Sequence, residues 1–515
     1  MTDWQSECDV LVAGSGAGGV TGAYTAAREG LGVMLVEATD KFGGTTAYSP
    51  GGGMWFPCNP VLQRAGVDDT IDDALEYYHA VVGSRTPRAL QDTYVRGGAP
   101  LIEYLEQDPC FGFDPYPWPD YFGKAPKARL DGQRHMVARP LPVAEAPELR
   151  ELVRGPLEVD RLGAAVPDDL FIGGRALVAR ALKAMRRFPN ASLRLEQPLV
   201  ELIQEGGRVV GAIVEHDGQR CAIRARRGVL LSAGGFEHND ELRRKYHVPG
   251  SSRDAMGPPG NRGRALLAGM VAGAATDLLD QAWWSPGLTH PDGRSAFALG
   301  FTSGIFVDGR GQRFVDESAP YDRLGRAILA HLGDGVAPLR YWMIYDDSHG
   351  LVPPVQYPNI PLAPTQQYVE AGLWRSAGTL AELAVKIGVP AANLLATVAR
   401  FNELAARGVD SDFGRGDEAY DRFFSDGRAP LVAIEHAPFH AAAFGVSDLG
   451  TKGGLVTNSS GNVLDTQGHP IQGLYAAGNS MAAPSGTAYP GGGNPIGTSM
   501  LFAHLSVRHM LEQRA

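Results

Sequence analysis

The pattern of apolar and polar positions predicts a strand, a helix and a second strand at the start of the chain. Residues 8–13 form an apolar run typical of a buried strand, and residues 14–19 read G-x-G-x-x-G. A helix is expected over residues 18–28, with Gly30 placed where a glycine often ends a helix. The apolar run 33–36 predicts the next strand, which ends at Glu37. The chain therefore begins with a β–α–β unit.

Apolar runs further along the chain predict a larger sheet. A mixed helical region extends to about residue 187, and a β-meander follows it. A buried strand is then expected over residues 228–236, where Gly234 and Gly235 let the backbone come close to another group. The strands expected in the meander cover residues 192–194, 200–205, 208–216 and 219–226.

The composition changes between about residues 282 and 444, where aromatic residues, proline and amphipathic helices such as 380–406 are frequent. The earlier pattern resumes at residues 473–479, and a glycine-rich segment at 491–497 opens a last helix that runs to about residue 511. We therefore expect an α/β protein in which a Rossmann-like domain is built from both ends of the chain and carries an inserted α+β domain. The expected bounds are 1–281 and 447–515 for the first domain and 282–446 for the insertion.

The glycine-rich turn has the pattern of a dinucleotide-binding site. Gly14 allows a tight turn, Gly16 lets the backbone approach a pyrophosphate, and Gly19 lets the helix pack on the strand. The helix N-terminus offers N–H groups and a partial positive charge to phosphates. Glu37 lies where a carboxylate accepts hydrogen bonds from the adenosine ribose, and its charge disfavours the 2′-phosphate of NADP.

Four glycine-rich segments indicate FAD rather than a nicotinamide cofactor. They are spread over residues 14–19, 43–53, 234–235 and 478–497, and such a split suits a longer ligand that stays bound. The N-terminus of the last helix would face the flavin edge where negative charge develops on reduction. The domain of residues 1–281 and 447–515 is thus expected to bind FAD, and residues 282–446 to form the catalytic domain. The residues expected to bind FAD are Gly14, Ser15, Gly16, Ala17, Gly18, Gly19, Glu37, Ala38, Gly43, Gly44, Thr45, Thr46, Ser49, Gly51, Gly52, Gly53, Val200, Ala233, Gly234, Gly478, Asn479, Asn494, Pro495 and Ile496.

Composition and charge argue against several other classes of protein. The 515 residues carry a formal net charge of −10, which disfavours nucleic acid and gives no help on an acidic membrane. The first residues lack the apolar core of a signal peptide, and no stretch is long and apolar enough to span a bilayer. The four cysteines form no C-x-x-C pair and the histidines show no metal-binding spacing, so no metal is expected. The expected location is the cytoplasm, with peripheral membrane association left open.

Longer motifs give a more specific indication than the nucleotide turn. Residues 9–19, 473–479 and 491–499 together resemble flavoproteins related to fumarate reductase. More narrowly, W-P-D-Y-F at 118–122, R-F-V-D-E-S-A-P-Y-D-R at 313–323 and P-S-G-T-A-Y-P-G-G-G-N-P-I-G at 484–497 resemble the bacterial 3-ketosteroid Δ1-dehydrogenase family. The resemblance covers essentially the whole chain, with one departure at Pro50, where glycine is expected.

The resemblance implies FAD-dependent 1,2-desaturation of a 3-ketosteroid in bacterial steroid degradation, with a proton leaving C2 and a hydride passing from C1 to flavin N5. It implies that the Tyr489 hydroxyl and the Gly493 N–H bind the C3 oxygen, that Tyr321 is the base for C2, and that Tyr121 supports Tyr321. A phenol has an ordinary pKa of about 10, so such a base needs its anion stabilised, which is a reason for a second tyrosine.

The implied partners are a substrate of the androst-4-ene-3,17-dione class and an electron acceptor, either a quinone or another carrier. A flat apolar substrate needs apolar walls. The candidate walls are Trp118, Phe122, Trp283, Trp284 and Phe301.

Three alternatives remain open on the sequence. A dicarboxylate reductase of the same fold would need cations for two carboxylates, for which residues 290–294 with Arg294 are the candidate, although we interpret them as a turn. A 3-ketosteroid Δ4-(5α)-dehydrogenase would share fold and cofactor. A flavin-binding scaffold or redox sensor would have no turnover at all.

Overall fold

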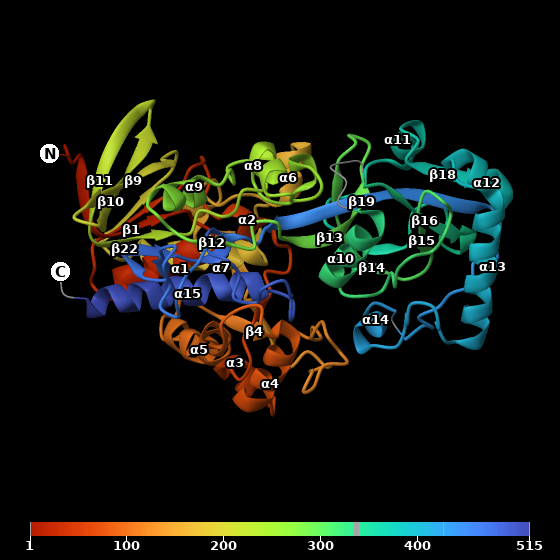
Figure 1. Cartoon of the computed structure of the whole chain (residues 1–515), viewed down its shortest axis with the longest axis horizontal. Helices are drawn as coiled ribbons and strands as arrows, with labels where there is room; N and C mark the ends of the chain where they lie inside the picture. Colours follow the sequence, from red (N-terminus) through yellow and green to blue (C-terminus); the bar gives the residue numbers. More distant parts are fainter. Residues whose placement is uncertain (1, 334–338, 426, 514–515) are drawn as a thin grey trace. The chain divides into compact units, whose positions relative to one another are not determined.

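The computed structural model describes residues 2–333, 339–425 and 427–513 (Figure 1). The described chain forms two compact units. The first comprises Met1–Leu242, Gly257–Ala282 and Gly450–Ala515, and the second comprises Arg243–Met256 and Trp283–Leu449. The chain therefore passes between the units four times.

Segment 243–256 differs from the expected bounds, since the sequence analysis placed it within residues 1–281. It is joined to the second unit by hydrogen bonds from Ser295 N–H to Asp254 (2.6 Å) and from Met256 N–H to the carbonyl of Asp448 (2.8 Å). A buried ion pair links Arg243 to the Asp448 carboxylate at 2.8 Å. These contacts join residues about 40 to 200 positions apart, which explains why no local pattern predicts them.

The first unit is built on a sheet with the strand order β21-β22-β11-β1-β2-β8. Strands β22, β11, β1, β2 and β8 run parallel, and β21 is antiparallel to β22. The middle of β1 is fully buried at Val10, Leu11 and Val12, as expected for a parallel strand covered on both faces. The bounds are β1 (Ser6–Ala13), β2 (Val33–Val36), β8 (Ala191–Arg194), β11 (Gln219–Leu231), β21 (Asn462–Leu464) and β22 (Pro470–Ala476).

Three helices pack closely in this unit. Helix α1 (Ala17–Arg28) contacts both α7 (Gly174–Met185) and α15 (Asn494–Glu512), and Figure 1 shows them on the same side of the sheet. Nearly all of α1 is buried, because its glycine and alanine side chains let neighbouring backbones approach. The two ends of the chain therefore meet in one core.

The remaining helices and strands of the first unit are short or lie at its edges. Strands β9 and β10 extend the sheet beyond β11 in an antiparallel meander. Their bounds, with those of the other elements, are β9 (Leu199–Glu205), β10 (Arg208–His216), α2 (Gly44–Tyr48), β3 (Met54–Trp55), α3 (Pro60–Arg64), α4 (Ile71–Val82), α5 (Arg88–Glu106), β4 (Phe113–Pro115), β5 (His135–Ala138), β6 (Leu141–Pro142), α6 (Leu157–Leu162), β7 (Leu170–Phe171), α9 (Arg264–Val271), β12 (Thr276–Asp277) and β20 (Gly454–Leu455), and α8 (Asp240–Lys245) spans the boundary with the second unit.

The second unit contains a sheet with the order β15-β16-β19-β13-β14-β17, in which β18 also pairs with β19. Helices α12 and α13 bury apolar residues such as Leu383 and Val398 in a cluster with Ile305, Ile344 and Ala441 of the sheet. The bounds are β13 (Ala282–Thr289), β14 (Ser295–Phe301), β15 (Ile305–Val307), α10 (Tyr321–Leu332), β16 (Tyr341–Asp346), β17 (Val355–Pro358), α11 (Thr365–Glu370), β18 (Trp374–Ala377), α12 (Leu380–Ile387), α13 (Ala391–Arg407), α14 (Ala419–Phe423) and β19 (Phe439–Thr451).

The predicted β–α–β start is confirmed by β1, α1 and β2, but four other element predictions are wrong. Residues 192–194 form β8, which pairs with β2 and not with the meander. The strands expected at 219–226 and 228–236 are one strand, because β11 pairs with β10 over its first half and with β22 over its last residues. The loop 43–53 contains α2. The helical region expected over 380–406 is divided, because α12 ends at Ile387 with Gly388 as a left-handed cap (φ +76°) and α13 begins only after Pro390.

Candidate active site

The glycine-rich segments follow the carboxyl ends of parallel strands in the first unit. Gly14 follows β1, Glu37 follows β2, Gly234 follows β11 and Gly478 follows β22. Parallel strands end at the same edge of a sheet, where ligands bind in open α/β folds. The structure therefore brings together segments that are up to 464 residues apart in the sequence.

The turn after β1 has space that its own chain does not fill. Gly14 has φ +98°, and a Cβ on Gly19 would lie 1.8 Å from the Gly14 carbonyl oxygen, so the backbone itself requires both glycines. Gly16 is different, because its φ is −65° and a Cβ there would meet nothing closer than Thr46 Oγ1 at 3.4 Å. The N-cap residue of α1, Gly16, has no side chain to cap the helix, and the first N–H, of Ala17, donates to Thr46 Oγ1 at 3.0 Å. The open face at Gly16 fits the close approach of a phosphate group.

Glu37 is buried and its carboxylate is already hydrogen-bonded. One oxygen accepts from the Ser15 N–H (3.2 Å) and hydroxyl (2.6 Å), and the other accepts from the N–H and hydroxyl of Thr39, both at 3.0 Å. A carboxylate has about four acceptor positions, and the chain's own donors use them. A ribose hydroxyl at this carboxylate would therefore share or replace the hydrogen bond from Ser15 Oγ.

The segment 43–53 is held by a partner that the sequence analysis missed. A Cβ on Gly174 would lie 1.8 Å from the Thr46 carbonyl oxygen, and a Cβ on Gly173 would lie 2.2 Å from that of Pro50. Gly173 and Gly174 open helix α7, so the N-terminus of this helix lies against the loop. The signal was present as a Gly-Gly pair between a short strand and an amphipathic helix.

Two further polar residues tie the site together. Ser480 Oγ accepts from the Ala233 N–H (3.0 Å) and donates to the Gly234 carbonyl (3.1 Å), which joins the ends of β11 and β22. Asn261 donates to Thr45 Oγ1 at 2.9 Å. Neither was predicted, because nothing near them in the sequence marks the contact. Among the other expected FAD residues, Ala38 lies next to Glu37, Val200 lies at the start of β9, and Gly44, Ser49, Gly51, Gly53 and Asn479 are half-buried.

The N-terminus of α15 carries a buried polar side chain. Asn494 is 0% exposed, and its amide makes no hydrogen bond of ordinary geometry with the described residues, although it interacts with the buried hydroxyls of Tyr78 and Tyr94. Pro495 and Ile496, in the same turn, are half-buried. Buried polar groups are normally satisfied, so Asn494 fits a site that is completed by a ligand.

Tyr121 and Tyr489 lie edge to face, with ring centroids 5.3 Å apart. They are 1% and 3% exposed. The Gly493 N–H donates to the Tyr489 hydroxyl at 3.3 Å, and the Trp118 indole N–H donates to the Tyr121 hydroxyl at 3.2 Å. The Gly493 N–H is directed at the Tyr489 oxygen, so an oxyanion that binds both donors would share this N–H with the hydroxyl or replace the hydroxyl as its acceptor.

A buried ionic network supports the strand-like segment that carries Tyr121. The Asp120 carboxylate accepts hydrogen bonds from the Trp55 indole (2.8 Å) and from Arg134 (2.8 Å), and Arg134 is also paired with Asp69 at 2.7 Å. Burial raises the pKa of Asp120 to about 6, although Arg134 opposes the shift. Burial and the charge of Arg134 lower the pKa of the neighbouring His135 to about 3, so this imidazole is neutral.

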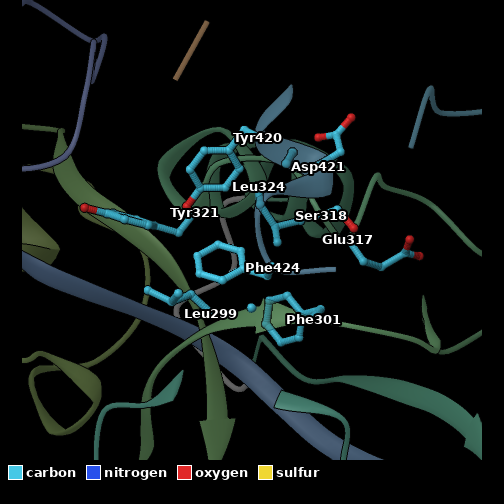
Figure 2. Close-up of a pocket in the computed structure, with 11 residues that line it drawn as sticks. Leu299, Phe301, Glu317, Ser318, Tyr321, Leu324, Tyr420, Asp421 and Phe424 are labelled. Carbon is cyan, nitrogen blue, oxygen red and sulfur yellow. The ribbon is translucent and has the colours of Figure 1, made fainter. Parts of the chain in front are cut away.

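Tyr321 belongs to the second unit, where it begins helix α10. It is buried, its ring packs edge to face on Phe297 with centroids 4.8 Å apart, and it lines a pocket with Phe301, Leu324 and Phe424. Figure 2 shows the Tyr321 hydroxyl directed away from the pocket carboxylates of Glu317 and Asp421. The pocket therefore lies beside the ring and not at the hydroxyl.

The charged residues of the 313–323 motif anchor the loop before Tyr321. Arg313 binds Glu317 through two hydrogen bonds of 2.9 and 2.8 Å, and Arg415 binds the same carboxylate at 3.1 Å. Burial, together with the charges of Asp421 and Glu317, raises the pKa of Asp316 to about 8. This network fixes the end of the motif from which α10 starts.

The structure also shows where the candidate aromatic walls of the substrate site lie, and where Arg294, the candidate cation for a dicarboxylate, lies. Trp283 and Trp284 are buried on β13, whereas Trp118 and Phe122 are half-buried in the first unit. Residues 290–294 form the turn between β13 and β14, as interpreted, and Arg294 is paired with Asp292 at 2.5 Å. This pairing disfavours Arg294 as a carboxylate receptor.

Within residues 2–333, 339–425 and 427–513, no helix is long and apolar enough to cross a membrane.

Known proteins are similar to this chain over nearly its full length. The model of the family described as "FAD binding domain" matches residues 9–496. A 3-oxosteroid 1-dehydrogenase of Mycolicibacterium smegmatis is 36% identical, over 97% of this chain and 96% of its own. A 4-oxocyclohexanecarboxylate 2-dehydrogenase of Sinomonas cyclohexanicum is 33% identical, over 99% and 94%.

A solved structure agrees with these matches. The 3-ketosteroid Δ1-dehydrogenase of Sterolibacterium denitrificans, in complex with 1,4-androstadiene-3,17-dione, superposes with a TM-score of 0.88 and 30% identity, covering 99% of this chain and 100% of its own. The likeness extends through both units, since no large part of either chain is left out. The chain therefore belongs to the FAD-binding flavoprotein family, in the branch that contains the 3-oxosteroid 1-dehydrogenases.

Proposed function

We propose that this chain is an FAD-dependent dehydrogenase that introduces a double bond between C1 and C2 of a 3-ketosteroid. The observation that carries the proposal is the grouping of Tyr489, the Gly493 N–H and Tyr121 in one buried site. The same grouping has no role in dicarboxylate reduction, which needs cations. The likeness to steroid dehydrogenases at 30 and 36% identity supports the same substrate class.

The FAD-binding domain of the proposal is the first unit, with a Rossmann-like arrangement of its parallel strands. The phosphates would lie at Gly16 and the N-terminus of α1, and the flavin end at the N-terminus of α15 with Asn494. Supporting contacts would come from the loop 43–53 and from Gly234 and Gly478. The second unit is the proposed catalytic domain because it carries Tyr321.

The Tyr489 hydroxyl and the Gly493 N–H are the proposed donors to the C3 ketone oxygen. Loss of the C2 proton places negative charge on that oxygen, and two preorganised donors stabilise it where water is excluded. Tyr321 is the proposed base that takes the C2 proton, with Tyr121 in support. Bound FAD supplies the acceptor for the hydride that leaves C1. Proton and hydride together account for both hydrogens removed.

The oxyanion site recognises a cyclic ketone, and its surroundings decide which one. Two classes fit the relatives: a steroid of the androst-4-ene-3,17-dione class and a monocyclic oxocyclohexanecarboxylate. Arg294, the candidate cation for a dicarboxylate, is paired with Asp292. We favour the neutral steroid because the identity to a 3-oxosteroid 1-dehydrogenase is 36%, against 33% to the oxocyclohexanecarboxylate dehydrogenase. A quinone or another carrier is the proposed electron acceptor. The proposed location is the cytoplasm, where free thiols such as the four cysteines stay reduced.

The proposal is tested by mixing the FAD-loaded chain anaerobically with androst-4-ene-3,17-dione and, separately, with 4-oxocyclohexanecarboxylate. We expect the steroid to bleach the flavin absorbance within seconds and the carboxylate to do so at least 100-fold more slowly. A faster reaction with the carboxylate would move the substrate to the monocyclic class. Oxidation of the pre-reduced protein by fumarate would favour the reductase, and a flavin spectrum unchanged by either ketone would favour a scaffold.

A further inference from the structure

The peptide carbonyls on both sides of Tyr489 are held by buried donors. The Ala488 carbonyl accepts hydrogen bonds from Ser485 Oγ (3.0 Å) and Lys452 Nζ (2.5 Å). The Pro490 carbonyl accepts from the Tyr121 N–H (3.0 Å) and from the Tyr77 hydroxyl (2.5 Å). The backbone around Tyr489 is therefore fixed by Ser485 of its own loop and by Lys452, Tyr121 and Tyr77 from outside it.

Tyr77 differs from the other donors because it lies outside both catalytic segments and bonds to each of them. Its hydroxyl donates to the Pro490 carbonyl and accepts from the Phe122 N–H at 3.3 Å. Pro490 directly follows Tyr489, and Phe122 directly follows Tyr121. One hydroxyl group therefore links the two segments next to a short backbone bridge between Asp120 and Gly491.

The ring of Tyr77 is itself held firmly. It is 0% exposed, the Arg134 guanidinium lies 5.1 Å from its centroid, and the Trp55 ring lies 6.2 Å away. Arg134 is fixed in turn by Asp69 and Asp120. Burial raises the pKa of Tyr77 well above its ordinary value, so its hydroxyl keeps the proton that it donates. The packing around the ring therefore fixes the position of the Tyr77 hydroxyl.

We propose that Tyr77 is a positioning residue for catalysis, which sets the distance between the Tyr489 oxyanion site and Tyr121. The inference rests on the proposed function, because it needs both tyrosines to act on the ketone. Without the Tyr77 hydroxyl the Pro490 carbonyl keeps one donor and the Phe122 N–H loses its acceptor. The Tyr121 N–H bond to the Pro490 carbonyl and the bridge between Asp120 and Gly491 then join the two segments without Tyr77, which allows shifts of fractions of an ångström. Such a displacement affects the rate far more than it affects binding.

The test compares Tyr77→Phe with Tyr345→Phe in the FAD-loaded full chain. Tyr345 is a matched control, because its buried hydroxyl also donates to a carbonyl at 2.5 Å, that of Leu351, in the second unit. For each variant we measure bound FAD, melting temperature, steroid affinity, flavin reduction per bound FAD, and exchange of the steroid C2 hydrogens with D2O. We expect Tyr77→Phe to keep FAD and steroid affinity within twofold, and to lose at least tenfold in both reduction and exchange. Tyr345→Phe should change neither rate by more than twofold.

Three results would overturn the inference. Equal rates in the two variants would show that the hydroxyl has no positioning role. Loss of steroid affinity in proportion to the rate would make Tyr77 a binding determinant, and failure of Tyr77→Phe alone to fold or load FAD would make it a stability residue. If the wild-type chain neither exchanges C2 hydrogens nor reduces its flavin with steroid, the proposed function itself fails, which is a separate outcome.

Discussion

Replacing Tyr489 by phenylalanine removes one oxyanion donor and leaves the packing of the ring in place. The ring is 3% exposed and lies 5.3 Å from that of Tyr121, and both features are kept by phenylalanine. The lost hydroxyl is the acceptor of the Gly493 N–H, which is half-buried, so the free energy of unfolding should fall by only about 1 kcal/mol. Loss of one preorganised donor to a developing oxyanion costs about 3 to 4 kcal/mol in the transition state, or roughly 100- to 1,000-fold in rate.

The assay is anaerobic stopped-flow reduction of bound FAD by androst-4-ene-3,17-dione, with C2 hydrogen exchange measured on the same samples. Tyr475→Phe is the control, because this buried tyrosine of β22 loses a comparable hydrogen bond, to His509 at 2.9 Å. Both variants should load FAD, and only Tyr489→Phe should become slow in reduction and exchange. A Tyr489→Phe rate within threefold of wild type would refute the oxyanion assignment.

Three other predictions follow from the site. Tyr321→Phe should retain FAD and lose desaturation by several orders of magnitude in the same stopped-flow assay; near-normal turnover would remove Tyr321 from the role of base. Gly16→Ala should lower bound FAD at least tenfold and leave the melting temperature of the apoprotein within about 2 °C. The control Gly309→Ala, at another glycine with open space around its Cβ position, should leave the flavin content unchanged. Equal flavin content in both variants would contradict the assignment of the phosphate site to Gly16. His135 is neutral in the folded chain because its pKa is lowered to about 3, whereas in the unfolded chain its pKa is the ordinary value of about 6.5. Only the unfolded chain therefore gains a proton at His135 as the pH falls, and the free energy of unfolding should decrease by about 2 kcal/mol between neutral pH and pH 5. His135→Phe should flatten this dependence in urea titrations, and an unchanged slope would contradict it.

The parts of the structure that the sequence predicted are those with a local signature. The first strand, the turn at Gly14 and Gly19, and the second strand ending at Glu37 are specified by residues close together in the chain. Only the family resemblance indicated that Tyr121 and Tyr489 belong to one site, because 368 residues separate them in the sequence.

The parts that the sequence missed depend on contacts between distant residues. Tyr77 reaches Pro490 across 413 positions, and Ser480 reaches Ala233 across 247. Neither residue type nor spacing distinguishes Tyr77 from the other tyrosines of the chain. Gly173 and Gly174 had a recognisable pattern, but only the structure reveals that the backbone of Thr46 and Pro50 lies within 2.2 Å of where their Cβ atoms would be.

The central claim is that the new double bond forms between C1 and C2, and one product analysis tests it directly. The FAD-loaded chain is mixed anaerobically with one equivalent of 5α-androstane-3,17-dione, in which both the C1–C2 and the C4–C5 bonds are saturated, and the product is identified by NMR. We predict bleached flavin and a product with olefinic hydrogens at C1 and C2 only. A double bond at C4–C5, or a flavin that stays oxidised, would contradict the account.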